Sequence, residues 1–505
     1  MNAYTLASLA AYFILMLAIG LYAWRRSTGD SAGYLLAGRN LPPSVAALSA
    51  GASDMSGWLL LGLPGALYAT GLVEAWIGIG LFIGALANWV LVAPRLREQT
   101  ERIGNALTIP QFLANRFPER GTALRVTSAI IIVAFFTVYT AAGLVGGGKL
   151  FETAFAGILP NTGLSDYMLG IVITAGIVLA YTMVGGFLAV SLTDFVQGLI
   201  MMGALVIMPL VVMFGPGGEA GGSVVAVPQE GFLDLTYGLT AIGFISAVTW
   251  GLGYFGQPHI IVRFMAINRV ENVRRAAAFG MGWMGIALLG SIGLGIAGRA
   301  YAERNGLVVD DPETIFIVLA QLLFHPAVTG FLYAALLAAI MSTISSQLLV
   351  SSSSLTEDFY RLFLRRNASE REAVNVSRGA VALVAIAAIV IAADPNSQVL
   401  GLVANAWAGF GAAFGPLILL ALMWHGKDGT GKDGTGMTGA GAVAGLVTGA
   451  GVVAGWIALG WNAQLPTALG GGPGLYEIVP GFAAAMAAII VVSKFTRPNS
   501  AKGAL

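Results

Sequence analysis

Residues 49–57 read SAGASDMSG, and this polar stretch stands in the middle of the apolar run 42–70. Its serines, glycines and aspartate disfavour a regular helix, yet lipid offers the backbone no hydrogen-bond partners. A second stretch, WGLGYFGQP at residues 250–258, brings three glycines and a proline into the apolar run 236–261. Interrupted membrane helices are the best sequence indication of a transport site. Glycines that serve only close helix packing would also explain either stretch alone.

The composition indicates that lipid is the solvent for most of the chain. Hydrophobic residues make up 57% of its 505 residues and charged residues only 10%, whereas soluble domains carry about 25% charged residues. This excludes an ordinary soluble enzyme. The net charge of +1 gives no general attraction to nucleic acid. The chain has no cysteine for thiol chemistry or metal binding, and its three histidines are too scattered to predict a metal cluster.

Apolar runs of membrane-spanning length recur along the whole chain. A bilayer core about 30 Å thick needs about 20 helical residues. If the N-terminus lies outside, the inner loops hold every Lys and Arg except Lys149, Arg299 and Arg304, as the positive-inside rule expects. We therefore expect an all-helical membrane protein with an outer N-terminus and a cytoplasmic C-terminus. Its thirteen predicted spans are 4–24, 42–70, 72–93, 124–150, 164–184, 188–214, 236–261, 276–299, 326–355, 374–393, 398–424, 437–460 and 476–494.

The positions of the two interrupted runs indicate an internal repeat. Counting five spans from each interruption gives two five-helix units, 42–214 and 236–424, and because five is odd the second unit is inverted relative to the first. Residues 1–41 add one helix and a loop, 425–436 form a glycine-rich linker, and 437–505 add two helices and a tail. Because the sequence lacks a phosphate-loop motif and a loop long enough for a soluble domain, an ion gradient or passive flow must drive transport.

A set of oxygens suited to sodium is predicted where span 326–355 meets the first interruption. On one helical turn, the carbonyl of Ala339 lies beside the hydroxyls of Ser342 and Thr343. A broken helix would free the carbonyls of Ala52 and Met55 as two further oxygens. The alternative is that both hydroxyls only bond back to a carbonyl one turn earlier, as Ser and Thr in membrane helices usually do.

Asp54 is the most costly residue of the first interruption. A carboxylate at the centre of a membrane helix costs about 2.5–3.5 kcal/mol on insertion scales, so a functional role is the default hypothesis. Two roles remain open. Asp54 could attract or transiently hold a cation, or it could cap the second half of the broken helix by accepting N–H bonds from Ser56 or Gly57.

The two interruptions also predict a site for a small zwitterionic solute. Half-helix N-termini favour a carboxylate, and unwound carbonyls favour an ammonium group. Trp250, Tyr254 and Pro258 share one face if their helix persists, because they are spaced at i, i+4 and i+8. Packing of aromatics without any ligand is the alternative for each ring. The predicted substrate contacts are Ser56, Gly57, Trp58, Tyr139, Trp250, Tyr254 and Pro258.

Several motifs together resemble the sodium/solute symporter family, and the resemblance covers nearly the whole chain. It is closest to bacterial members that carry proline. The stretches around Asp54 and around Ser342-Thr343 are the specific ones, whereas isolated glycines carry no weight. The motifs are LAGRN at 36–40, ALSAGASDMSGW at 47–58, FFTVY at 135–139, YTMVGGFLAV at 181–190 followed by Thr193 and Asp194, GYFGQPH at 253–259, AIMST at 339–343 and TED at 356–358.

The resemblance implies a leucine-transporter-like inverted repeat of five plus five helices, with one helix before it and two after it. It implies symport of sodium with L-proline across the bacterial inner membrane, without another cofactor or nucleic acid partner. It also implies that Asp54 is essential for sodium and that Asp194 lies near the cytoplasmic sodium exit, where a solvated helix-end carboxylate is the alternative. The family's sodium ligands map onto Ala52, Met55, Ala339, Ser342 and Thr343.

Other functions remain open at this point. Another solute of the family, such as a sugar, pantothenate or sialic acid, would need a wider pocket than Trp58, Trp250 and Tyr254 suggest. Proton coupling through Asp54 is a further alternative. A passive channel would carry solute without coupling to a gradient, and a membrane enzyme would need a nucleophile–base pair that the sequence does not offer.

Overall fold

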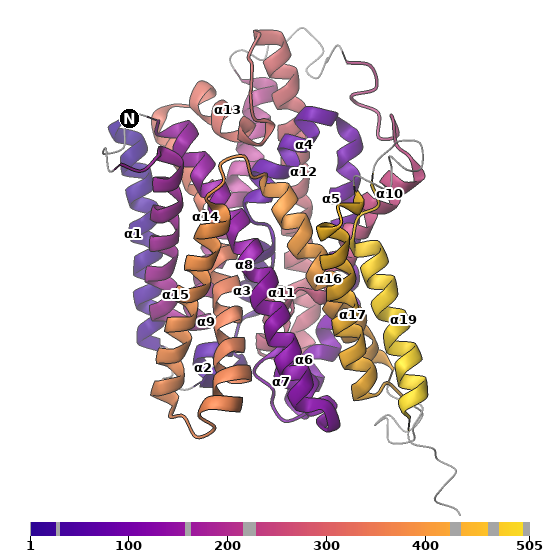
Figure 1. The fold of residues 1–505 in the computed structure, drawn as a ribbon. Coiled ribbons are helices and arrows are strands. Elements are labelled where there is room, and N and C mark those ends of the chain that lie inside the picture. Colours follow the sequence, from indigo (N-terminus) through magenta and orange to yellow (C-terminus); the bar gives the residue numbers. More distant parts are fainter. Residues whose placement is uncertain are drawn as a thin grey trace, which may run out of the picture.

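The computed structural model describes residues 2–26, 31–156, 163–215, 229–424, 436–462 and 474–497. These parts of the chain are helical and contain no strand, apart from one isolated bridge between Leu41 and Ile267. The glycine-rich linker predicted at 425–436 lies outside the described residues except for its last position. The helices run roughly alongside one another, as Figure 1 shows.

Eleven helices of the described residues are long and apolar enough to cross a membrane. They coincide with eleven of the predicted spans. The two exceptions are the interrupted runs 42–70 and 236–261, where shorter helices follow one another. The long elements are α1 (Ala3–Arg26), α5 (Ala75–Ala87) continued by η4 (Asn88–Val92) and α6 (Ala93–Arg102), α8 (Gly121–Ala154), α9 (Asp166–Phe214), α12 (Val273–Asn305), α14 (Pro326–Ser353) continued by η9 (Ser354–Leu364), α15 (Glu370–Ala392), α16 (Val399–Met423), α17 (Gly439–Ala458) and α19 (Ile478–Thr496).

Short helices occupy the two ends of the bundle. At one end lie α2 (Ser31–Leu36), η1 (Ala37–Arg39), α7 (Ile109–Arg116), η5 (Pro118–Arg120) and η7 (Val270–Asn272), and at the other lie η3 (Leu72–Glu74), η8 (Pro312–Thr314) and α13 (Ile315–Leu323). In Figure 1 the N-terminus is at the upper end with α13, whereas α2 and α7 are at the lower end. The two ends of the bundle therefore carry different sets of short helices.

The predicted spans 164–184 and 188–214 meet within α9 without an intervening loop. The chain reverses at Gly186, where φ is +60° and ψ is −161°. A side chain there would stand 2.7 Å from the ring of Tyr34, so glycine serves both the positive φ and the close contact. The two predicted spans are thus present, joined by a turn rather than a loop.

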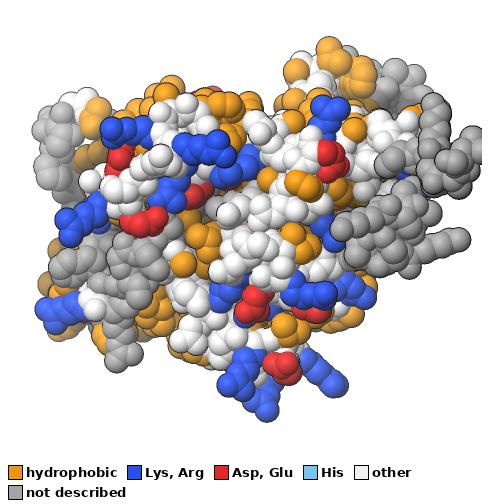
Figure 2. All heavy atoms as spheres, turned by 90° about the horizontal axis from the view of Figure 1, so that it is seen from below, with side chains coloured by type: hydrophobic (Ala, Val, Ile, Leu, Met, Phe, Trp, Pro, Cys, Tyr) orange, Lys and Arg blue, Asp and Glu red, His pale blue; other side chains and the backbone are white. Residues whose placement is uncertain are grey.

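The lower end of the bundle carries many basic side chains. Figure 2, which views this end from below, shows Lys and Arg side chains gathered there among some Asp and Glu. One basic residue had been predicted incorrectly. Arg263 was expected in a cytoplasmic loop, but it lies within α11 (Pro258–Ala266) and is 1% exposed. Its burial follows from an ion pair that sequence spacing does not reveal.

Candidate functional site

The first interruption lies between α3 (Pro43–Asp54) and η2 (Trp58–Gly62), which continues into α4 (Leu63–Thr70). Met55 leaves the helical region with φ −82° and ψ 74°. The carbonyl of Asp54 then accepts hydrogen bonds from the backbone N–H of Ser56 at 2.9 Å and from the indole of Trp58 at 3.2 Å. Buried side chains therefore satisfy the broken backbone, as a membrane interior requires.

The second interruption is longer and has a different geometry. After α10 (Ala241–Val248), η6 (Thr249–Gly256) is a 3₁₀ helix, and Gln257 is extended with φ −80° and ψ 105° before α11 begins. Side chains at Gly251 and Gly256 would stand 2.3 Å from the carbonyl of Gly80 and 2.2 Å from that of Phe410. These glycines thus serve close helix packing, while the stretch as a whole is interrupted as predicted.

Four of the five predicted sodium ligands lie together where α3 meets α14, namely Ala52, Ala339, Ser342 and Thr343. The hydroxyl of Ser342 is 2.8 Å from the carbonyl of Ala52 and 3.1 Å from that of Ala339. The hydroxyl of Thr343 is 3.2 Å from the same Ala339 carbonyl. Both hydroxyls therefore bond back within α14, as the alternative interpretation expected, and Ser342 additionally joins α14 to α3. Met55, the fifth predicted ligand, is buried at the non-helical position that ends α3.

Asp54 is 2% exposed, and its carboxylate accepts a hydrogen bond from the hydroxyl of Tyr254. This bond links the first interruption to the second. The other carboxylate oxygen, Oδ1, has no hydrogen-bond partner among the described residues. The helix following the interruption has no side-chain cap, and the N–H of Ser56 bonds to the main-chain carbonyl of Asp54 instead. The alternative that the Asp54 side chain caps this helix is therefore wrong.

Four of the predicted substrate contacts lie around the first interruption. Ser56 and Trp58 are buried there, and the N–H of Trp58 is 3.4 Å from the hydroxyl of Ser56. Gly57 packs so closely on α14 that an added Cβ would stand 3.1 Å from the Ile340 side chain. The hydroxyl of Tyr139, on α8, is 3.4 Å from the carbonyl of Asp54. The structure therefore brings these four residues together.

Trp250, Tyr254 and Pro258 do not share one face. A 3₁₀ helix has 3.0 residues per turn, so side chains four residues apart diverge by about 120°, and Gln257 then breaks the helix. Trp250 stacks on Tyr476 with ring centroids 5.0 Å apart and faces a cavity of about 980 Å³. Tyr254 faces a cavity of about 20 Å³ together with Asp54. The expected single aromatic face is therefore wrong.

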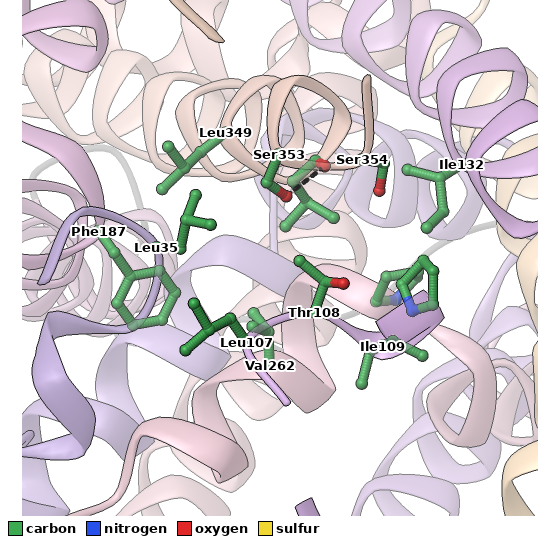
Figure 3. Close-up of a pocket in the computed structure, with 13 residues that line it drawn as sticks. Leu35, Leu107, Thr108, Ile109, Ile132, Phe187, Val262, Leu349, Ser353 and Ser354 are labelled. Carbon is green, nitrogen blue, oxygen red and sulfur yellow. Dashed lines mark hydrogen bonds between the residues drawn. The ribbon is translucent and has the colours of Figure 1, made fainter. Parts of the chain in front are cut away.

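Pro258 faces a third cavity, of about 20 Å³, at the lower end of the bundle. Figure 3 shows side chains from several elements pointing into it, among them Leu107, Thr108, Phe187 and Leu349. Thr108 is held by Asp358 of η9, which also pairs with Arg125 of α8 at 2.7 Å. The lining is mostly apolar, and the ion pair between Asp358 and the partly exposed Arg125 joins η9 to α8.

The large cavity lies between α4, η8 and the start of α16. Its walls carry four carboxylates, from Glu152, Asp310, Asp311 and Glu313. Lys149 pairs with Asp311 at 2.7 Å and with Glu313 at 2.8 Å. Glu313 also accepts the first N–H groups of α16, each at 2.9 Å. The cavity is therefore wide and negatively charged, and it leads from the upper end toward Trp250.

Asp194 is fully buried, contrary to the alternative of a solvated helix end. Its carboxylate accepts hydrogen bonds from Ser49 at 2.7 Å and from Arg263 at 3.0 Å, and Arg263 also reaches Ser346 of α14. The cluster joins α3, α9, α11 and α14. Burial of an ion pair demands such additional hydrogen bonds, because each charge loses its hydration.

Sequence reasoning missed Arg263 and two residues that hold the second interruption. The indole of Trp407 on α16 donates to the carbonyl of Trp250 at 2.7 Å, and its ring contacts that of Tyr254 edge-on at 5.0 Å. Gln257 donates to the carbonyl of Trp407 at 3.1 Å. The charge of Arg263, just beyond an apolar run, could have indicated its role. Trp407 could not be singled out, because its sequence context is that of any other aromatic residue in a membrane span.

Two interrupted helices, a set of buried oxygens and separate cavities above and below them define a membrane transporter. A family model described as the sodium:solute symporter family matches residues 34–449. The chain belongs to this family, and it is therefore a transporter rather than an enzyme.

Two curated relatives match nearly the full chain. The osmoregulated proline transporter OpuE of Bacillus subtilis (strain 168) is 49% identical over 97% of this chain and 94% of its own length. The sodium/proline symporter of Staphylococcus aureus (strain JH9) is 49% identical over 99% of this chain and 94% of its own length.

Two solved structures share the fold. A sodium-coupled sialic acid symporter, solved in a substrate-bound outward-open state, aligns with a TM-score of 0.77 at 18% identity, covering 98% of this chain and 99% of that one. Mhp1, a nucleobase-cation-symport-1 family transporter in a closed conformation, aligns with a TM-score of 0.56 at 16% identity, covering 92% and 95%.

Proposed function

We propose that this protein is a secondary active symporter that couples inward sodium movement to uptake of L-proline by alternating access. The observation that carries the proposal is the contact between the hydroxyl of Ser342 and the carbonyl of Ala52, which joins α14 to the end of the first interrupted helix. The choice of proline rests on the names of relatives that are 49% identical over nearly the whole chain.

Sodium binds, in this proposal, to the oxygens of Ala52, Met55, Ala339, Ser342 and Thr343. Hard oxygens in a buried place suit a small hard cation, and each hydroxyl can turn its proton away so that its oxygen faces the ion. Because Ser342 bridges two helices, a cation at this point draws α3 and α14 together. Asp194 of α9 and its partner Arg263 of α11 contact Ser49 of α3 and Ser346 of α14, and they serve the ion's path toward the cytoplasm.

In this proposal, proline contacts the predicted substrate residues one after another along its path through the protein. Trp250 borders the large upper cavity and contacts the incoming solute, while Ser56, Gly57, Trp58, Tyr139 and Tyr254 surround the central interruptions. Pro258 borders the closed lower cavity and contacts the solute on its way out. This order agrees with alternating access, in which opposite ends open in turn.

The fold proposed for this function has thirteen spans, eleven of them continuous and two interrupted. It consists of inverted units at 42–214 and 236–424, preceded by the helix of residues 1–41 and followed, after the linker 425–436, by two helices within 437–505. The basic lower face in Figure 2 supports a cytoplasmic lower end and an outer N-terminus. The protein is accordingly assigned to the bacterial inner membrane.

The sodium gradient supplies enough free energy for this work. One charge moving down about 100 mV yields about 2.3 kcal/mol, and a tenfold sodium gradient adds about 1.4 kcal/mol. Together these terms concentrate a neutral zwitterion about 500-fold at one-to-one coupling.

Uptake of labelled L-proline into proteoliposomes tests the proposal. Vesicles are given an inward gradient of sodium, lithium or protons as the only driving ion, and L-proline competes with a sugar, pantothenate and sialic acid. We expect accumulation with sodium and competition by L-proline alone. Accumulation driven by protons without sodium would assign Asp54 to proton coupling instead, and flux that never exceeds equilibrium would indicate a passive channel.

A further inference from the structure

The cavity that Asp54 shares with Tyr254 contains a second buried polar side chain. Asn88 is 1% exposed, and neither its amide nitrogen nor its amide oxygen has a hydrogen-bond partner among the described residues. It begins η4, a π-helical segment that continues α5. Segments of this kind are frequent at functional sites. A buried amide without hydrogen-bond partners destabilises the folded protein, so its presence in an otherwise apolar wall requires a reason.

In the same cavity, Asp54 places a carboxyl group that has no paired cation among the described residues. Its Oδ1 atom is buried without a partner, and its Oδ2 atom accepts only the hydroxyl of Tyr254 among the described residues. The nearby Arg263 is committed to Asp194, to the hydroxyls of Ser49 and Ser346 and to the carbonyl of His259. A buried carboxylate is stable only when a cation or several donors compensate it.

The cavity has the size of one small ion or one water molecule. Its volume is about 20 Å³, whereas one water needs about 10–15 Å³ by this measure. Proline is several times too large to enter it. The remaining walls come from α3, α5, α11 and α12 and are almost wholly apolar. Ala85, Trp89 and Met284 are among them.

The cavity is separate from the five-oxygen set. Ala47, Ala50, Gly51, Asp54 and Met55 border it, and this spacing describes one face of α3. The opposite face of α3 carries the hydroxyl of Ser49 toward α9 and the carbonyl of Ala52 toward α14. One short helix thus presents ligands on two sides, and only Met55 belongs to both.

We propose that Asn88 and Asp54 hold a second sodium ion in this cavity. The carboxylate provides the negative charge, and the amide oxygen of Asn88 and the hydroxyl of Tyr254 provide further oxygens. Asn88 is therefore a further cation ligand, contributed by a helix on which sequence analysis placed none. The inference rests on the proposed sodium coupling and adds a second position to it.

Equilibrium binding of ²²Na⁺ to the purified full-length protein tests this proposal. At saturating L-proline we expect the wild type to bind two ions per chain and Asn88→Leu to bind one, because leucine has a similar volume but no amide. In uptake assays Asn88→Leu should raise the sodium concentration for half-maximal rate about tenfold, the equivalent of about 1.4 kcal/mol. Proline affinity at saturating sodium should stay within about twofold.

A second variant and a control separate ligand loss from damage to the fold. Ala85→Val fills the cavity from another position and leaves both ligands in place, so it should also lose the second ion. Ser291→Ala removes a buried hydroxyl of α12 that donates to Leu59 at 2.7 Å and does not border the cavity. It should keep wild-type sodium dependence, whatever its effect on stability.

Failure of the second sodium position and failure of the proposed symport would give different results. One bound ion in both the wild type and Asn88→Leu, with unchanged sodium dependence, would mean that the cavity holds water and would overturn the second sodium position. A wild-type uptake rate that does not depend on the sodium concentration would overturn the proposed symport instead. If Asn88→Leu does not fold, the ²²Na⁺ count in Ala85→Val decides between sodium and water.

Discussion

The two interrupted helices look equivalent in the sequence, but their backbones are interrupted in different ways and make different contacts. The first breaks within two residues after Asp54 and exposes carbonyls and a carboxylate. The second unwinds over the eight residues of η6 and packs its backbone against α5 and α16. In the proposed function the sharp break supplies oxygens to the ion, whereas the long 3₁₀ segment turns aromatic rings toward different cavities. Tyr254 joins the two through its bond to Asp54.

The largest expected effect tests whether close packing maintains the second interruption. Gly251→Ala would set a Cβ 2.3 Å from the carbonyl of Gly80, and backbone cannot yield as a flexible side chain does. We expect little folded protein after extraction, measured by size-exclusion chromatography and thermal unfolding. Gly282→Ala is the matched control, because an added Cβ there meets nothing within 4 Å. Normal yield and stability of Gly251→Ala would mean that η6 is not held by this contact.

The second prediction concerns the charge at the first interruption. Asp54→Asn keeps the size of the side chain and removes its charge. A unit charge about 5 Å from a cation contributes about 3 kcal/mol at an effective dielectric constant of about 20. We expect the sodium concentration for half-maximal uptake to rise about 100-fold. A variant that retains wild-type sodium dependence would show that this interruption serves the fold rather than the ion.

Much of this contrast could be predicted, because it depends on local composition. Apolar runs, and stretches rich in serine, glycine and proline within them, located both interruptions and the oxygens of Ser342 and Thr343. The geometry of η6 could not be predicted, since it depends on glycines meeting backbone from α5 and α16. Arg263 was misassigned for a similar reason: its partner Asp194 lies 69 residues away in the sequence.

Asn88 illustrates the same limit. An asparagine near the end of an apolar span usually marks the membrane interface, and nothing in its neighbourhood predicts the π-helical segment that begins there. Only the packing of α3, α11 and α12 around it shows that its amide is enclosed with Asp54. Residues whose role comes from distant contacts are therefore the ones that sequence analysis misses.

A third prediction compares the two hydroxyls of the sodium set. Ser342→Ala removes the contact between α14 and Ala52, whereas Thr343→Ala removes a hydroxyl that donates to Ala339 within α14. One lost oxygen costs about 1–1.5 kcal/mol, so each change should raise half-maximal sodium about tenfold. Thr343→Ser, which retains the oxygen, is the control. Unchanged sodium dependence in both alanine variants would exclude α14 from the site.

The smallest effects should separate Tyr254 from Trp250. Tyr254→Phe keeps the ring but removes the donor to Asp54. The buried carboxylate then has one partner fewer, and the sodium concentration for half-maximal uptake should rise about fivefold to tenfold.

Trp250→Phe keeps an aromatic ring at the large cavity but reduces the ring area that stacks on Tyr476. It should raise the KM for proline about threefold and leave sodium dependence unchanged, because it touches no ion ligand. Titration of sodium at saturating proline, and of proline at saturating sodium, distinguishes the two effects. If both variants shift only proline affinity, the bond between Tyr254 and Asp54 does not connect the second interruption to the ion. If both shift only sodium affinity, the large cavity is not the route of the solute.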